Sequence, residues 1–243
     1  MYPSPSPTPF NSAHFRARVV KILLAAGAVA TTISLLVEAI SLAFPPLATE
    51  QELGDNPIGA VLILMTSLVA LLEFVIYVAT VVAFLMWLHR ACKSVLEFNP
   101  WNRLTYSAGF AVGSFFIPFM NLVVPYRIVK EVWQKSGTPD EARFAAPSPP
   151  AMFPAWWLFW LLAGFTNNLS MRLTLSERLE NSGAAIISIV ASAMSIIAAI
   201  FAYLVVDAID RKQEETIAKL HLGKFPTLPP PPPDLRTAIT HFE

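Results

Sequence analysis

The sequence predicts an all-α fold: a polytopic membrane helix bundle with four transmembrane helices and one proline-broken re-entrant segment. Hydrophobic residues make up 55% of the 243 residues and charged residues only 14%, which lies outside the usual range for a soluble domain of this length. Long stretches carry no charge, and Lys and Arg cluster at their edges, as they do in membrane proteins. We expect the membrane-embedded core to run from about Arg16 to about Arg211.

Two tails are expected to flank this membrane domain, which covers residues 16–215. Residues 1–15 open with MYPSPSPTPF. This segment cannot form a helix and has little to bury, so it is predicted to be a disordered Pro/Ser-rich tail. Residues 216–243 are predicted to be a Pro-rich cytoplasmic tail, whose proline run favours polyproline II. Because the chain starts without a basic region ahead of an apolar one, the first transmembrane helix is expected to serve as the targeting signal.

The first two spans are predicted at residues 18–44 and 58–87. Only Lys21 and Glu38 interrupt the first run, which is long enough to cross a hydrocarbon core of roughly 30 Å at about 1.5 Å per residue. The loop between the spans carries acidic residues but no Lys or Arg. The second span ends in aromatic and basic residues that are typical of a membrane interface, namely Trp87, His89, Arg90 and Lys93.

Residues 107–126 form an apolar stretch that is not expected to be a straight helix. Pro118 and Pro125 lie inside it, with Asn121 between them, and prolines kink or break helices. The following stretch, residues 126–135, alternates apolar with charged side chains. It is predicted to be an amphipathic helix, which suits both a position on the anionic inner leaflet and a simple helical exit from the broken segment.

Two further apolar segments follow. Residues 155–165 open with three tryptophans and can be extended to residue 169, while residues 184–206 are more uniformly apolar and continue into a charged helical extension over residues 207–219. Small residues recur on one face of the last span and predict close packing against a neighbouring helix: Ser188, Ser192, Ser195, Ala199 and Ala202.

The distribution of basic residues decides how many of the five apolar segments cross the membrane. If all five cross, the Lys and Arg residues divide about evenly between the two sides, which violates the positive-inside tendency. If residues 107–126 enter and leave on the same side, every basic residue except Arg172 and Arg178 falls on the cytoplasmic side. A broken segment at membrane depth is allowed where protein covers it or water reaches it. We therefore predict four spans plus one re-entrant segment, with five transmembrane helices as the alternative.

Glu73 is the strongest candidate for a functional residue, because it lies near the middle of the second span. A charged carboxylate at that depth costs several kcal/mol, so we expect it to be protonated, hydrogen-bonded or exposed to a water-filled cavity. Two readings stay open: a proton or cation site, and a neutral side chain whose hydrogen bond locks two helices together. The second is favoured, because no membrane-embedded Lys, Arg or His partner is evident. The candidate hydrogen-bond partners are Asn121 and the serines of the last span.

Other kinds of chemistry have little support. The sequence contains no Walker loop, nucleophile elbow, HExxH motif or paired catalytic carboxylates, so we expect no enzyme activity, no cofactor and no metal site. The single cysteine, Cys92, excludes an internal disulfide. The basic residues follow topology instead of forming a nucleic-acid surface. The expected partners are the lipid bilayer together with other proteins or further copies of the chain.

The segment WLHRACKSVLEFNPWNRLTYSAGFAVGSFFIPFMNLVVPYRIVKEVW, residues 87–133, resembles the core of an uncharacterised bacterial multi-pass membrane family, domain of unknown function 4328 (DUF4328). Trp156 and Trp157 at the next span, and Gln213 after the last, are similar to that family too. The resemblance implies the membrane architecture and brings no established activity. Within the segment it rests on Trp87, Arg90, Pro118, Asn121, Pro125, Glu131 and Trp133.

Two functions from different classes remain. The first is a non-enzymatic integral membrane protein, an accessory, sensory or scaffold module that acts through partner or lipid contacts. The alternative is a small oligomeric transporter or channel for ions, protons or solutes, which would use Glu73 and the hairpin between Pro118 and Pro125, since interrupted helices expose carbonyls and helix ends that bind ions. In both cases we expect the cell (inner or plasma) membrane, with both termini in the cytoplasm.

Overall fold

The computed structural model describes residues 13–43, 57–98, 104–138, 147–175 and 181–221, and all regular structure within them is helical. The predicted all-α class is confirmed. The elements, in chain order, are α1 (His14–Ala43), α3 (Pro57–Phe98), α4 (Ala108–Gly113), the 3₁₀ turns η1 (Ser114–Phe116) and η2 (Met120–Leu122), α5 (Val124–Lys135), α7 (Met152–Leu175) and α8 (Asn181–His221).

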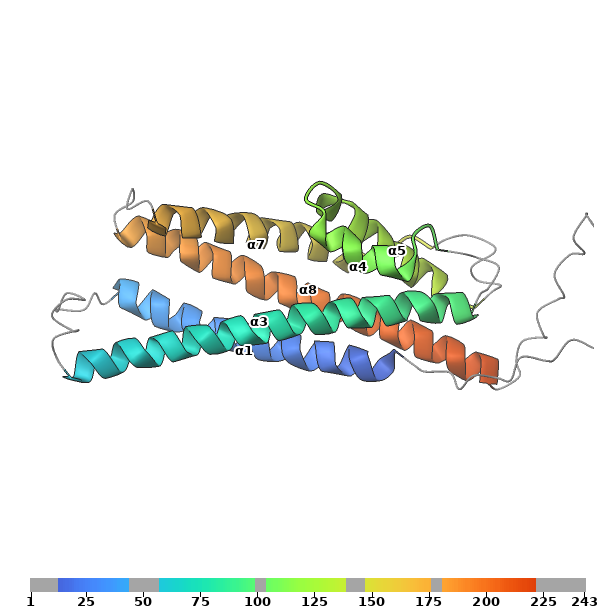
Figure 1. The fold of residues 1–243 in the computed structure, drawn as a ribbon, viewed down its shortest axis with the longest axis horizontal. Coiled ribbons are helices and arrows are strands. Elements are labelled where there is room, and N and C mark those ends of the chain that lie inside the picture. The colour runs from blue at the N-terminus through green and yellow to red at the C-terminus, as the bar shows by residue number, and fades with distance from the viewer. Residues whose placement is uncertain (1–12, 44–56, 99–103, 139–146, 176–180, 222–243) are drawn as a thin grey trace, which may run out of the picture.

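The long helices α1, α3, α7 and α8 form an elongated bundle, and α4 and α5 pack against one side of it (Figure 1). Helices α1 and α7 end at one end of the bundle, where α3 and α8 begin. Toward the other end α1 begins, α3 and α8 finish, and α4 and α5 lie beside the start of α7 (Figure 1). We call this second end the α5 end. The broken segment therefore starts and finishes at the same end of the bundle.

Among the described residues, three helices are long and apolar enough to cross a membrane, over His14–Ile40, Leu64–Glu97 and Ala185–Leu220. At about 1.5 Å per residue, the 30 residues of α1 and the 42 of α3 exceed a hydrocarbon thickness of roughly 30 Å. Helix α7 has 24 residues, which is long enough for a span. It is not among the three, and the adjacent amides of Asn167 and Asn168 lower its hydropathy.

The broken segment is a series of short turns, as its prolines predict. Ser107 caps α4 by accepting a hydrogen bond from the backbone N–H of Phe110 at 3.2 Å. Pro118 lies exposed between the two 3₁₀ turns, and Pro125 lies buried in the first turn of α5, where a missing N–H costs nothing. The indole N–H of Trp157 donates to the carbonyl of Leu122 at 3.0 Å, which ties the segment to α7.

The apolar face of α5 is covered by protein. Ile128 is 2% exposed, and Val129 and Val132 are fully buried. The structure therefore agrees with the interpretation of α5 as a helical exit from the broken segment, with its apolar side turned to the bundle. The position of α5 on the inner leaflet stays a prediction. The charged side chains remain on its outer face.

The buried core is concentrated at the α5 end. It includes the fully buried side chains of Trp87, Val132, Phe153, Val205 and Ile209 from four different helices, while Phe84 contacts the rings of Trp87, Phe115 and Trp156 at centroid distances of 5.4–6.0 Å. Away from this end the helices are open: 6% of the most apolar window of α1 is buried, and 0% of that of α3. Such surfaces suit lipid or another protein more than water.

The helices extend past the predicted limits of the membrane domain. Helix α1 includes His14 and Phe15, and α8 runs without a break through the charged extension to His221. Thr216 shows why α8 continues: it is 2% exposed, and its hydroxyl donates to the carbonyl of Ser136 at 2.8 Å. The start of the first predicted tail, residues 1–12, and the end of the second, 222–243, lie outside the described residues.

Candidate functional site: the charge cluster between α1 and α8

Polar side chains line one face of α1 just after it begins. His14 and Lys21 are seven residues apart, which places them on the same side of the helix. On α8, Asp207, Asp210 and Arg211 follow the last apolar run at spacings of three and four. The two helices run in opposite directions and pack against each other (Figure 1), so these two sets of side chains meet.

Asp210 is the centre of the arrangement, since its side chain is only 3% exposed. Its carboxylate accepts from Nδ1 of His14 at 3.0 Å and from Nζ of Lys21 at 3.3 Å. Lys21 also donates to Oδ1 of Asp207 at 2.9 Å, and Nε of Arg211 lies 2.7 Å from Oδ2 of Asp207. We call these five residues the charge cluster. A buried carboxylate is tolerated here because cations and hydrogen bonds compensate for its lost hydration.

The cluster also provides a set of atoms that could ligate a metal. Single ligand atoms of His14, Asp210 and Glu214 lie within 4.8 Å of one another. Lys21, however, already places an ammonium group 3.3 Å from the carboxylate of Asp210. That positive charge occupies the position in which a divalent ion would be favoured, and it would repel one. The geometry therefore favours an ion-pair network that fastens α1 to α8.

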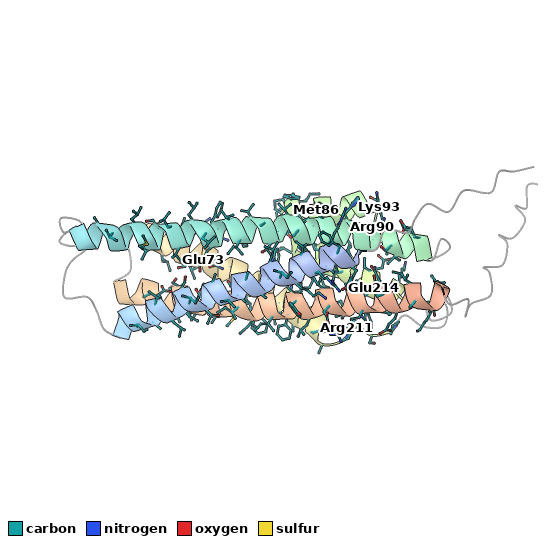
Figure 2. All side chains as sticks on the ribbon, turned by 90° about the horizontal axis from the view of Figure 1, so that it is seen from below. Glu73, Met86, Arg90, Lys93, Arg211 and Glu214 are labelled. Atoms are coloured by element: carbon teal, nitrogen blue, oxygen red, sulfur yellow. The ribbon has the colours of Figure 1, made fainter. Side chains whose placement is uncertain are left out.

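Glu73 lies in the opposite half of the bundle from the charge cluster (Figure 2). Its Oε1 is 2.7 Å from Oγ of Ser34, so a hydrogen bond joins α3 to α1 within two apolar runs. The predicted partners, Asn121 and the serines of α8, do not take this role. Ser195, one of those serines, is bonded to Asn167 of α7 at 3.2 Å. The helix-locking interpretation of Glu73 agrees with this geometry, with Ser34 as the partner.

Asn121 lies in η2, and its backbone N–H donates to the carbonyl of Ile117 at 2.8 Å. Its side-chain Oδ1 is buried and has no hydrogen-bond partner in the part of the chain that the structure describes. The structure thus does not bring Asn121 and Glu73 together. Together with Pro118 and Pro125, Asn121 shapes the turns between α4 and α5.

The remaining residues that the sequence singled out make contacts at the α5 end. Trp87 is fully buried against Phe84. Arg90 pairs with Glu97, seven residues or about two turns later on α3, through contacts of 2.8 and 3.0 Å. Figure 2 shows Arg90 beside Lys93 at this end of α3. These contacts stabilise the end of the helix.

Glu131 and Trp133 hold α5 in place. Glu131 accepts from the backbone N–H and the hydroxyl of Thr105, both at 2.9 Å, which fastens the chain leading into α4. The ammonium of Lys212 lies 4.2 Å from the ring centroid of Trp133 and donates to its carbonyl at 2.9 Å. Next to it, the amide of Gln213 donates to the carbonyl of Ala91 at 3.1 Å. Helices α3, α5 and α8 are thereby linked by polar contacts.

Sequence reasoning missed the charge cluster. The available signal was the pair Asp207 and Asp210, which follow an apolar span on one helical face, together with Lys21 inside the first span. A lysine near the start of the first apolar run and two carboxylates just after the last one lie at similar depths in an antiparallel bundle. Nothing in the sequence states that the first and last helices are neighbours, so the pairing needed the fold.

The family described as Domain of unknown function (DUF4328) matches residues 60–211, more than half of the chain. The chain belongs to this family. The resemblance that the segment 87–133 carries is confirmed. The DUF4328 region begins within α3 and ends at Arg211, so it includes Asp207 and Asp210 of the charge cluster, while α1 with His14 and Lys21 lies outside it. No curated protein and no solved structure matches the chain.

Proposed function

We propose that this DUF4328 protein is a non-enzymatic integral membrane module that acts as an accessory, sensory or scaffold subunit through contacts with partner proteins or lipids. One observation carries the proposal: the most apolar windows of α1 and α3 are 6% and 0% buried inside the protein. Exposed apolar side chains of this kind are stable when they are shielded from water, and a bilayer or the helices of a partner protein provide that shielding. The ionic groups, by contrast, are used within the protein, where the charge cluster joins α1 to α8.

The module has four transmembrane helices, α1, α3, α7 and α8, and a broken segment that enters and leaves at the α5 end. The same-end position of α4 and α5 supports this topology. So does the distribution of charge, because four spans leave only Arg172 and Arg178 on the side away from the α5 end. The α5 end and both termini face the cytoplasm, and the membrane is the cell membrane.

Glu73 serves as a helix lock in this proposal. Its hydrogen bond to Ser34, at 2.7 Å, gives the carboxyl group a partner within the apolar part of α3. A neutral carboxylic acid with one such bond costs far less at membrane depth than a carboxylate does. The alternative, transport through Glu73 and the Pro118–Pro125 hairpin, requires the two regions to act together, and Glu73 is bonded to α1 instead.

A flux assay in proteoliposomes tests the proposal. The full-length chain is reconstituted into vesicles that contain a pH-sensitive dye, and proton or potassium flux is driven by an imposed gradient. We expect native protein and the Glu73→Gln variant to give the same rate as protein-free vesicles. Flux by the native chain that disappears in Glu73→Gln would contradict the module and establish transport. Partners are sought in parallel by purification in mild detergent followed by mass spectrometry.

A further inference from the structure

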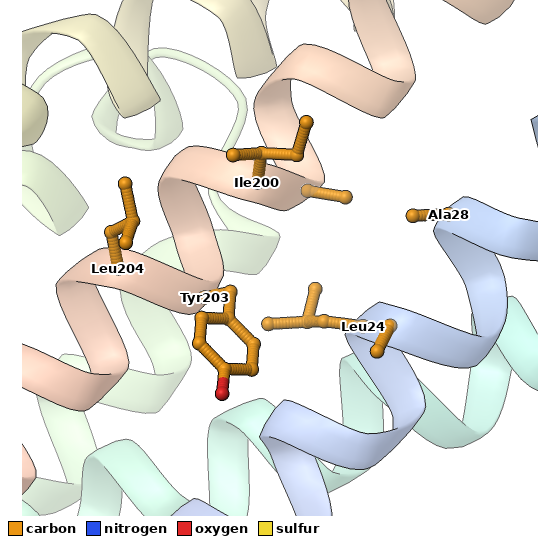
Figure 3. Close-up of a pocket in the computed structure, with 7 residues that line it drawn as sticks. Leu24, Ala28, Ile200, Tyr203 and Leu204 are labelled. Carbon is orange, nitrogen blue, oxygen red and sulfur yellow. The ribbon is translucent and has the colours of Figure 1, made fainter.

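A groove lies between α1 and α8, on the outer side of their contact. It encloses about 200 Å³ and is lined by Leu24, Ala25 and Ala28 from α1 and by Ile200, Tyr203 and Leu204 from α8 (Figure 3). Apart from the hydroxyl of Tyr203, these side chains are apolar. Ala25 and Ile200 are exposed, so the groove is open to whatever surrounds the bundle.

The groove lies at the depth of lipid chains. Arg18 precedes Leu24 by six residues, and Arg211 follows Leu204 by seven. At about 1.5 Å per residue, both arginines lie roughly 10 Å further toward the α5 end than the groove. When the two arginines are level with the lipid headgroups, that separation places the groove beside the part of the acyl chains that lies next to the headgroups.

The two arginines continue the faces that line the groove. Arg18 and Ala25 are seven residues apart on α1, as are Leu204 and Arg211 on α8, so each pair shares one side of its helix. Arg18 is exposed, and the side chain of Arg211 is 75% exposed. An apolar groove is thus followed, on both of its walls, by a guanidinium group.

The two guanidinium groups at the end of the groove nearest the α5 end, which we call its mouth, favour an anionic headgroup. Within the cluster, Nε of Arg211 lies 2.7 Å from Oδ2 of Asp207, and a guanidinium carries five N–H donors in a planar fork that fits phosphate oxygens. Lys21 lies between the arginines and the groove, where it offsets the charges of Asp207 and Asp210. The exposed Arg18 adds a positive charge on the α1 wall that a phosphate group can match, while the carboxylate of Glu214 lies near His14 and Asp210.

We propose that the groove binds one acyl chain of an anionic phospholipid whose phosphate group is held by Arg18 and Arg211. This inference rests on the proposed function, because the groove lies at acyl-chain depth only if α1 and α8 cross the bilayer. It names the lipid partner of the module. A lipid held in this way covers the outer side of the α1–α8 contact next to the charge cluster.

Native mass spectrometry of the full-length chain in mild detergent tests the site. The probes are dioleoyl phosphatidylglycerol and dioleoyl phosphatidylcholine, titrated separately, and the readout is the dissociation constant of the first bound lipid. We expect the anionic lipid to bind more tightly, by about fivefold for each arginine that it contacts. The double variant Arg18→Gln/Arg211→Gln should lose this preference and bind the two lipids equally.

Filling the groove is the second arm. Ala25→Phe places a ring in the groove from an exposed position and should weaken the binding of both lipids by roughly tenfold. Ala26→Phe, at an exposed position that does not line the groove, is the matched control, and Lys93→Gln removes an exposed basic residue from α3 at the same end. Both controls should stay within about twofold of the native chain.

Each outcome decides the proposal. Equal binding of the two lipids to the native chain, an Ala25→Phe variant with native affinity, or a dimer that forms through the groove in place of lipid binding would overturn it. If Arg211→Gln disturbs folding through its contact with Asp207, Arg18→Gln alone still tests the headgroup contact. If the chain shows neither flux nor a preference for the anionic lipid, only the lipid-binding proposal is refuted. Flux that depends on Glu73 would refute the proposed function itself.

Discussion

Replacing Lys21 with methionine removes the ammonium that joins the two carboxylates of the charge cluster. In the native protein this group lies 2.9 Å from Asp207 and 3.3 Å from Asp210, and its side chain is 15% exposed. Lys21→Met leaves Asp210, whose side chain is 3% exposed in the native protein, with the hydrogen bond to His14 in the cluster. Removing one member of a buried ion pair costs about 3–5 kcal/mol, and we expect the lower value because Asp207 keeps Arg211.

The assay is thermal unfolding of the full-length chain in detergent, followed by circular dichroism. A loss of about 3 kcal/mol corresponds to a decrease in Tm of roughly 6–12 °C for a chain of this size. The double variant Lys21→Met/Asp210→Leu should recover part of this loss, because it leaves no unpaired buried carboxylate at the centre of the cluster. Arg18→Met is the matched control, one turn away and exposed, and should change Tm by about 1–2 °C.

The reasoning is refuted if Lys21→Met melts within about 2 °C of the native chain, the range expected for the exposed control. A double variant that loses the sum of both single losses would also contradict it, because independent sites are additive and members of one network are not. Either result would mean that the charge cluster does not fasten α1 to α8.

Three further predictions follow from contacts elsewhere in the bundle. Ser34→Ala should destabilise the chain by about 0.6–1.7 kcal/mol, the range for hydrogen bonds between membrane helices, whereas Glu73→Gln, which keeps a partner for Ser34, should lose less; thermal unfolding compares the two. Asn121→Leu should leave Tm unchanged or raise it, because the buried Oδ1 that it removes has no partner among the described residues, and a clear decrease would reveal a contact that this geometry lacks. Gln213→Leu should cost about 1–3 kcal/mol, because it removes the two buried hydrogen bonds that the Gln213 amide donates to the carbonyl of Ala91 and the hydroxyl of Ser136, and hydrogen exchange of α3 should then rise near the α5 end.

Much of the fold could be predicted from the sequence because lipid imposes simple rules. An apolar run of about 20 residues or more satisfies its backbone groups in a bilayer by forming a helix, and this rule placed α1, the first part of α3 and the apolar part of α8. Pro118 and Pro125 predicted the broken segment for an equally local reason, since proline cannot continue a helix. The predicted bounds of these segments rest on local features too, namely the ends of the apolar runs and the positions of the prolines.

The lengths of the helices were harder to predict. Helix α3 continues past the predicted end of its span at Trp87 to Phe98. The helical extension predicted over residues 207–219 is present in α8, which runs on to His221. Tertiary contacts at the α5 end stabilise these extensions, such as the hydrogen bond between Thr216 and the carbonyl of Ser136. Hydropathy cannot report contacts between segments that lie far apart in the sequence.

The candidate site divides in the same way. Glu73 could be found from the sequence, because a carboxyl group inside an apolar run is conspicuous. Its partner Ser34 could not be found in this way, since nothing distinguishes Ser34 from other serines until α1 is known to pack on α3. The charge cluster joins Lys21 to Asp207 and Asp210 across almost the whole length of the chain. Its recognition requires the neighbours of each helix, which composition and spacing do not supply.

The membrane topology is the most direct test of the account. Single cysteines are introduced into a Cys92→Ala background at Ser12, just before α1, at the exposed Ser148 before α7, and at Ser182 near the start of α8. A membrane-impermeant maleimide is then applied to intact cells and to inverted vesicles. We predict that Ser12→Cys and Ser148→Cys are labelled only from the cytoplasmic side and Ser182→Cys only from the other. Labelling of Ser12→Cys and Ser148→Cys from opposite sides, or of Ser148→Cys and Ser182→Cys from the same side, would contradict the four-span module.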